Sequence, residues 1–86
     1  MTNALVLEAL VEVLIFLEFS EDEVVDPDAA IEVMETIAGI LQRMSSVERE
    51  AFLRQLEVLS DTQPISEIGQ RRSEYISDMP GYLGLA

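Results

Sequence analysis

The chain has 86 residues, 49% of them hydrophobic, and its 17 acidic residues against five basic ones give a net charge of −12. This length predicts one acidic helical domain over residues 1–86, and the hydrophobic content excludes a disordered chain. The absence of cysteine excludes disulfides and thiolate metal sites, and the negative charge disfavours binding to nucleic acid or to anionic membranes.

The first predicted helix runs from Asn3 to Phe19 and is apolar on most of its circumference. One broad apolar face, which we expect to form core, holds Val6, Leu7, Leu10, Val13, Leu14 and Leu17. A four-helix monomer can bury only one such stripe, so the remaining side chains are predicted to contact another chain, either a protein partner or a second copy in a homodimer. The candidates for this contact are Glu8, Glu12, Ile15 and Phe19.

The same segment does not read as a targeting or membrane sequence. It lacks a basic start, and Glu8 and Glu12 interrupt its apolar run, so neither a secretion signal nor a membrane span is predicted. A soluble, cytoplasmic protein is the expectation that follows.

An acidic loop over residues 20–25 precedes the second predicted helix. Asp26 is expected to cap this helix, Pro27 suits its first position, and Asp28 favours the positive end of its dipole. The helix is predicted to extend to about Met44. Its core side chains recur every three or four residues, at Ile31, Met34, Ile37, Ala38, Leu41 and Met44.

Acidic residues gather in this loop and continue along the second helix. Residues 1–42 carry ten acids and no base, and seven of those acids form our candidate partner-binding surface: Glu21, Asp22, Glu23, Asp26, Asp28, Glu32 and Glu35. Asp28 and Glu32 repel each other, and Gly39 weakens the helix. Two interpretations stay open: a binding surface, or a solvated face on which Gly39 permits close helix packing.

Two further helices are predicted. Ser45 and Glu48 form a capping-box pattern that begins a third helix over residues 46–59, with core positions at Phe52, Leu53, Leu56 and Leu59. Pro64 is expected to open a fourth helix that ends near Asp78, before Pro80 and Gly81. Its apolar stripe holds Ile65, Ile68, Tyr75, Ile76 and Met79. With short loops, these elements predict an all-α fold, a small four-helix bundle.

Arg72 falls in the centre of the apolar stripe of the fourth helix. Because a buried guanidinium must be paired or must reach water, we predict that Arg72 forms a structural ion pair with an internal carboxylate. The alternative is that this face of the helix meets another chain.

The chain lacks the residues of the common catalytic and metal-binding sites. It has no His and no Cys, which are the commonest general base, transition-metal ligand and thiol nucleophile. The segment from Glu21 to Glu32 fails as a calcium loop because Asp26 stands where the glycine is required. No Asp-Ser-Leu motif of an acyl carrier protein occurs. We therefore expect no enzyme, no metal and no cofactor, and predict a protein-binding module.

In size, charge, helix number and lack of catalytic groups, the whole chain resembles the small acidic helical immunity proteins of bacteria. These include the colicin nuclease immunity proteins and the immunity partners of type VI and contact-dependent effectors. The Tyr-Tyr-Pro signature of the colicin family is absent, since residues 75–80 read Tyr-Ile-Ser-Asp-Met-Pro, so no functional residue is carried over. The resemblance implies a cytoplasmic inhibitor that covers the active site of a toxin, or a surface adjacent to it, with carboxylates.

A second class of function stays open beside this one. A homo-oligomeric helical adaptor or regulatory protein would also explain why apolar residues occur on nearly all sides of the first helix.

Overall fold

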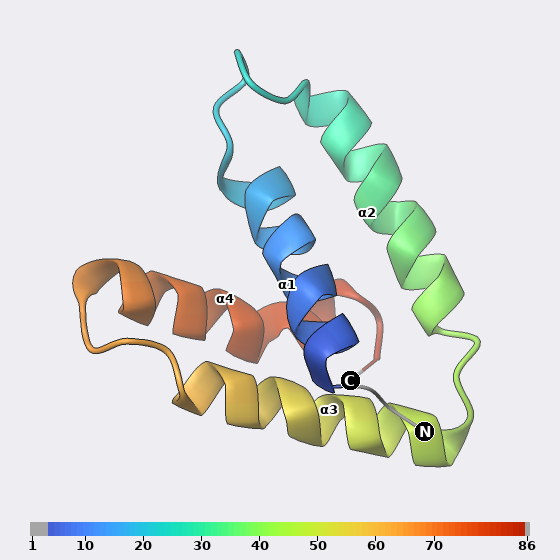
Figure 1. Ribbon diagram of the computed structural model, residues 1–86. Coiled ribbons are helices and arrows are strands. Elements are labelled where there is room, and N and C mark those ends of the chain that lie inside the picture. Colours follow the sequence, from blue (N-terminus) through green and yellow to red (C-terminus); the bar gives the residue numbers. More distant parts are fainter. Residues whose placement is uncertain (1–3, 86) are drawn as a thin grey trace.

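The computed structural model describes residues 4–85 and contains four helices: α1 (Ala4–Phe19), α2 (Pro27–Leu41), α3 (Ser46–Asp61) and α4 (Glu67–Tyr82). The described chain has no strand, so the predicted all-α fold is confirmed. α1 and α2 form one antiparallel hairpin, and α3 and α4 form a second hairpin that lies crosswise beneath the first (Figure 1). None of the helices in this range is long and apolar enough to cross a membrane.

The helix starts follow the local signals in the sequence. The Asp26 carboxylate accepts a hydrogen bond from the Ala29 amide at 3.3 Å, and Pro27 occupies the first turn of α2. At the start of α3 the Ser45 hydroxyl and the Glu48 carboxylate each accept from the other residue's amide, which completes the predicted capping box. The first helix is predicted from Asn3, a residue outside the described range.

The end of α2 differs from its predicted position. The helix ends at Leu41 rather than Met44, because the amides of Arg43 and Met44 donate to carbonyls only three residues back. This tighter turn brings the chain to Ser45, whose extended backbone begins α3.

The predicted bounds of the fourth helix are wrong at both ends. α4 begins at Glu67 rather than Pro64, since the Ser66 hydroxyl caps it by accepting from the Gly69 amide at 2.9 Å. The Pro64 carbonyl folds back against Gly69 so closely that a Cβ there would lie 1.8 Å from its oxygen. Ile65 and Ile68, predicted as core, are consequently exposed.

At its C-terminal end α4 continues through Pro80 and is followed by a turn at Gly84. Gly84 adopts a φ of +70°, and the Leu85 amide donates to the Pro80 carbonyl at 2.8 Å. With the bond from Gly84 to Gly81, this is a Schellman motif. The turn directs Leu83 and Leu85 into the core, so the C-terminal tail is a structural part of the bundle.

The core lies where the two hairpins cross. Its buried side chains are Leu7, Val11, Leu14, Ile15, Phe52, Leu56, Tyr75, Ile76, Met79, Leu83 and Leu85. The predicted core positions Phe52 and Leu56 of α3 are therefore confirmed. For α1 the buried stripe is rotated from the predicted one, leaving Val6 64% and Val13 50% exposed.

α2 is the least buried of the four helices. Ala30 is its only buried residue, and Ile31, predicted as core, is 54% exposed. The helix packs mainly on α1. Just past its end, the Gln42 side-chain amide donates to the Leu83 carbonyl at 3.0 Å and ties this hairpin to the C-terminal tail.

Candidate functional site

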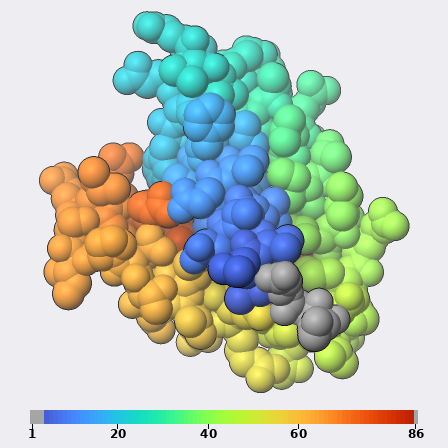
Figure 2. Space-filling model, viewed as in Figure 1, coloured from blue at the N-terminus to red at the C-terminus, as the bar shows by residue number. Residues whose placement is uncertain are grey.

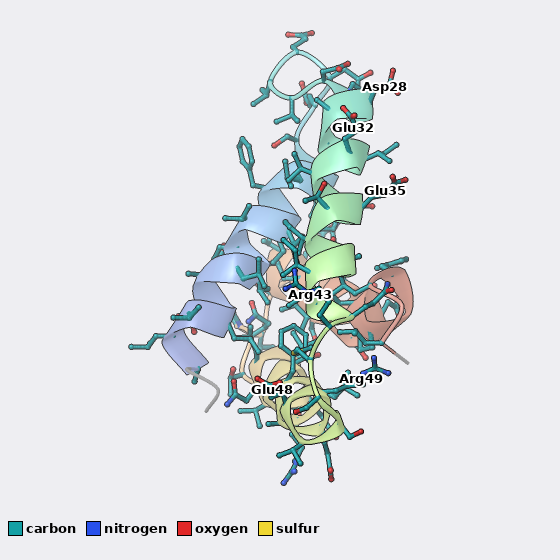
Figure 3. The ribbon with its side chains drawn as sticks, turned by 90° about the vertical axis from the view of Figure 1, so that its right-hand side faces the viewer. Asp28, Glu32, Glu35, Arg43, Glu48 and Arg49 are labelled. Atoms are coloured by element: carbon teal, nitrogen blue, oxygen red, sulfur yellow. The ribbon has the colours of Figure 1, made fainter. Side chains whose placement is uncertain are left out.

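The seven acids singled out in the sequence are all exposed, and they lie on the α1–α2 loop and on α2. We call this set the acidic ridge: Glu21, Asp22, Glu23, Asp26, Asp28, Glu32 and Glu35. Asp28, Glu32 and Glu35 follow one another down α2, with Glu35 on the side away from α1 (Figure 3). The ridge therefore presents carboxylates to solvent along one helix and the loop before it.

The loop that carries the first half of the ridge is held by backbone hydrogen bonds. The amides of Val24 and Val25 both donate to the Glu21 carbonyl, at 2.9 and 3.1 Å. Asp26 has a structural role as well, because its carboxylate caps α2. Asp28 lies in the first turn of α2, and the other five acids take no part in the helix start.

The carboxylates of the ridge are spread rather than gathered around a point. Within residues 4–85, no group of three acidic side chains is arranged to hold a metal ion. An extended row of like charges instead produces a negative field that attracts a basic protein surface and speeds its approach.

Gly39 lies on the same side of α2 as the ridge, and the structure supplies no packing reason for it. A Cβ built at this position would meet no atom within 4 Å. The interpretation that Gly39 permits close packing between helices of this chain is therefore wrong. An exposed helical glycine costs about 1 kcal/mol relative to alanine, and nothing within the described chain offsets that cost.

The residues predicted as a second contact on α1 are mostly engaged within the chain. Ile15 is only 8% exposed and belongs to the core. The Phe19 ring makes an edge contact with Tyr75 at 5.4 Å, with the Arg71 guanidinium 5.1 Å from its centroid. Ile15 is buried and Phe19 makes these contacts because α4 crosses α1 on this side. Ile15 is therefore corrected to a core residue, whereas Glu8, Glu12 and Phe19 stay exposed, Phe19 at 42%.

Arg72 connects three elements at this crossing. Its two terminal nitrogens donate to the two carboxylate oxygens of Glu12 on α1, and its Nε donates to the Gln63 side chain at 2.9 Å. The expected carboxylate partner is thus Glu12. We expected a buried pair, but the Arg72 and Glu12 side chains are 25% and 54% exposed.

A group of exposed apolar side chains on the first hairpin was not predicted from the sequence. Val13 and Phe16 on α1 and Val33 and Ile40 on α2 are 50%, 53%, 44% and 55% exposed. Two features of the sequence indicate this group. Apolar residues occur on all sides of α1, and Val33 and Ile40 are seven residues apart and therefore share a side of α2 outside its core stripe.

Comparison of the chain with known protein families, with curated proteins and with solved structures finds no match. The fold and the ridge define a small all-α protein that exposes an acidic surface.

Proposed function

We propose that this chain is a protein-binding module that binds and neutralises a bacterial toxin through the acidic ridge, as an immunity protein in the cytoplasm. The observation that carries the proposal is the exposure of all seven ridge acids in a half-chain without a single base. Such a surface steers a basic partner and disfavours partners of the same sign.

The way α2 is packed supports the same proposal. Because α2 buries only Ala30, its outer side contributes little to the core and is available to a partner. The homo-oligomeric adaptor is less well supported, since two copies would bring together surfaces of the same charge.

The first experiment identifies the partner and its effect. A protein retained by the chain from its native host at low salt should arrest bacterial growth when it is expressed alone. Co-expression of the chain should restore growth. If the retained proteins have no toxic effect, or if the chain does not relieve it, the immunity proposal is wrong.

The second experiment tests the ridge with the partner so identified. The double variant Glu32→Lys and Glu35→Lys should reduce the association rate about tenfold, because it reverses two charges that steer the encounter. A control with Glu57→Lys and Asp61→Lys on α3 makes the same change in net charge at exposed positions. Equal rates for the two variants would show that only total charge matters. For the wild type, the rate should fall with salt, which screens charges over about 8–10 Å.

A further inference from the structure

The outward side of the first hairpin carries an apolar surface that continues from α1 onto α2. We define the hairpin face by its exposed members, Ala9, Val13, Phe16, Val33 and Ile40. Ala9, Val13 and Phe16 are spaced by four and three residues and therefore share one side of α1. That side is opposite the buried stripe that contains Leu7 and Val11.

The α1 part of this face borders α2. Glu12 points toward α4, where it meets Arg72. Val13 is turned about 100° further around the helix, away from α4. α1 lies on the near side of the molecule, and its outer surface is uncovered in the space-filling view (Figure 2).

The α2 part of the face borders α1. Glu35 projects from α2 to the side away from α1 (Figure 3). At 100° per residue, Val33 and Ile40 lie about 140–160° around the helix from Glu35, which places them on the side toward α1. They are 44% and 55% exposed, so they lie beside the core rather than within it. The half-buried Leu10 and Ile37 pack against the core cluster.

Acidic residues border this apolar surface on its α2 side and at the loop. Glu32 immediately precedes Val33, and the loop acids Glu21 to Glu23 lie at the end of the hairpin, whereas Glu12 at the α4 side is paired with Arg72. A second copy seated on the face would bring Glu32 and the loop acids against the same acids, and none of these acids has a basic partner within the described residues. Charge complementarity instead requires an occupant with an apolar centre and basic flanks.

We propose that the hairpin face binds an amphipathic helix of the partner protein, whose apolar stripe is bordered by Lys or Arg. Two adjacent antiparallel helices present the ridges and grooves on which a third helix packs. From Ala9 to Phe16 the face spans about two turns, or roughly 10 Å, which matches anchors spaced by three, four and seven residues. The inference rests on the proposed function, because it names the contact by which a basic partner is held once the ridge has attracted it.

The test uses the full chain and a synthetic peptide. The probe is an 18-residue helical peptide of Leu and Lys with Leu on one side. Its two controls are a scrambled peptide of the same composition and an amphipathic peptide with Glu in place of Lys. We expect the Leu–Lys helix to bind one to one, to shift the backbone amide resonances of α1 and α2, and to bind at least tenfold more tightly than the scrambled peptide. The Leu–Glu helix should not bind.

Two triple variants separate this face from exposed apolar residues elsewhere. Val13→Gln, Val33→Gln and Ile40→Gln together should weaken binding of the Leu–Lys helix at least tenfold, with an unchanged circular dichroism spectrum. The control combines Val47→Gln, Val58→Gln and Ile65→Gln, at positions that are 78%, 62% and 106% exposed. It should bind like the wild type. Equal affinities for the two variants, or resonance shifts confined to α3 and α4, would overturn the proposal.

The outcomes also distinguish this inference from the proposed function. If a toxin is neutralised equally well by the wild type and the Val13, Val33 and Ile40 variant, the ridge proposal stands and the face proposal is wrong. If the peptide binds through the face but no toxin is found, the immunity proposal alone is wrong. Sedimentation showing a wild-type dimer that the hairpin-face variant abolishes would assign the face to a second copy and overturn the helix proposal.

Discussion

Ser60 and Ser73 are joined by reciprocal hydrogen bonds in which each hydroxyl donates to the other residue's backbone carbonyl, at 2.9 and 3.0 Å. The two hydroxyl oxygens are also 2.9 Å apart. Ser60 is buried and Ser73 half-buried, so this pair satisfies polar groups between α3 and α4 that would otherwise lose contact with water.

Replacing Ser60 by Ala should therefore destabilise the protein. The substitution removes both the donor to the Ser73 carbonyl and the hydroxyl contact, and we expect a loss of about 1–2 kcal/mol in the free energy of unfolding. Chemical denaturation of the variant measures this. Ser77→Ala, at an exposed position on α4, serves as the control and should be neutral or slightly stabilising. A Ser60 variant as stable as the control would show that the pair contributes nothing.

Arg72→Ala should cost about 1–2 kcal/mol, because the guanidinium binds the Glu12 carboxylate and the Gln63 amide at once. The loss is smaller than for a fully buried pair, since both side chains retain contact with solvent. Arg71→Ala should cost less than about 1 kcal/mol, which is the usual strength of an exposed cation–π contact such as that with Phe19.

A double-mutant cycle with Glu12→Gln and Arg72→Ala measures the pairwise energy directly. Additive effects of the two substitutions would mean that the ion pair does not stabilise the crossing of α1 and α4. A positive coupling energy is the expected result.

Gly39→Ala should raise the free energy of unfolding by up to about 1 kcal/mol, since alanine favours the helix and the new methyl group meets no neighbour. Gly69→Ala provides the opposite case, because its Cβ would collide with the Pro64 carbonyl. Thermal unfolding of both variants tests this contrast. If Gly39→Ala also weakens toxin binding, the glycine serves the partner's approach to the ridge. If toxin binding is unchanged, the substitution affects stability alone.

Tyr75 should make the protein sensitive to strongly alkaline pH. Burial, followed by the charges of Glu18 and Tyr82, raises the pKa of its phenol to about 12. Because the unfolded phenol ionises near pH 10, the stabilising contribution is complete below about pH 10 and is lost as the pH rises through about 12. Between these values, stability should fall by roughly 1 kcal/mol per pH unit.

The measurement of this effect is simple because the chain has no lysine. Urea denaturation from pH 9 to 11.5 should show the decline in the wild type and a reduced decline in Tyr75→Phe. Absorbance titration of Tyr82→Phe leaves only Tyr75 to ionise. A transition near pH 10 in the folded Tyr82 variant would contradict the raised pKa.

Hydrogen exchange should find α2 the least protected helix. Opening a helix locally costs mainly the burial that it loses, and α2 buries only Ala30. Amides of α3, which buries Phe52 and Leu56, should exchange more slowly. Equal protection of the two helices in native conditions would show that the whole chain opens as one unit.

Capping and periodicity were enough to predict the fold class and two of the helix starts. Asp26 and Ser45 are local signals that act through their own neighbours, so tertiary structure does not alter them. The exposure of the acidic ridge was likewise predictable, because charged side chains stay in water.

The buried stripe of α1 was not predictable in this way. A helix that is apolar on all sides gives the wheel no preferred direction, so the choice between Val13 and Ile15 depends on where α4 crosses. The Ser60–Ser73 pair depends on how α3 and α4 pack against each other, which local patterns do not contain.

The thin packing of α2 has a consequence for how such a protein can change over generations. Since the outer positions of this helix add little to the core, substitutions there can alter charge or shape without unfolding the chain. Under the proposed function, the other three helices can stay constant as a scaffold while successive single replacements on α2 change which partner is preferred. A lineage of such chains would diverge in specificity first along this helix, and only later, if at all, in the residues that fold it.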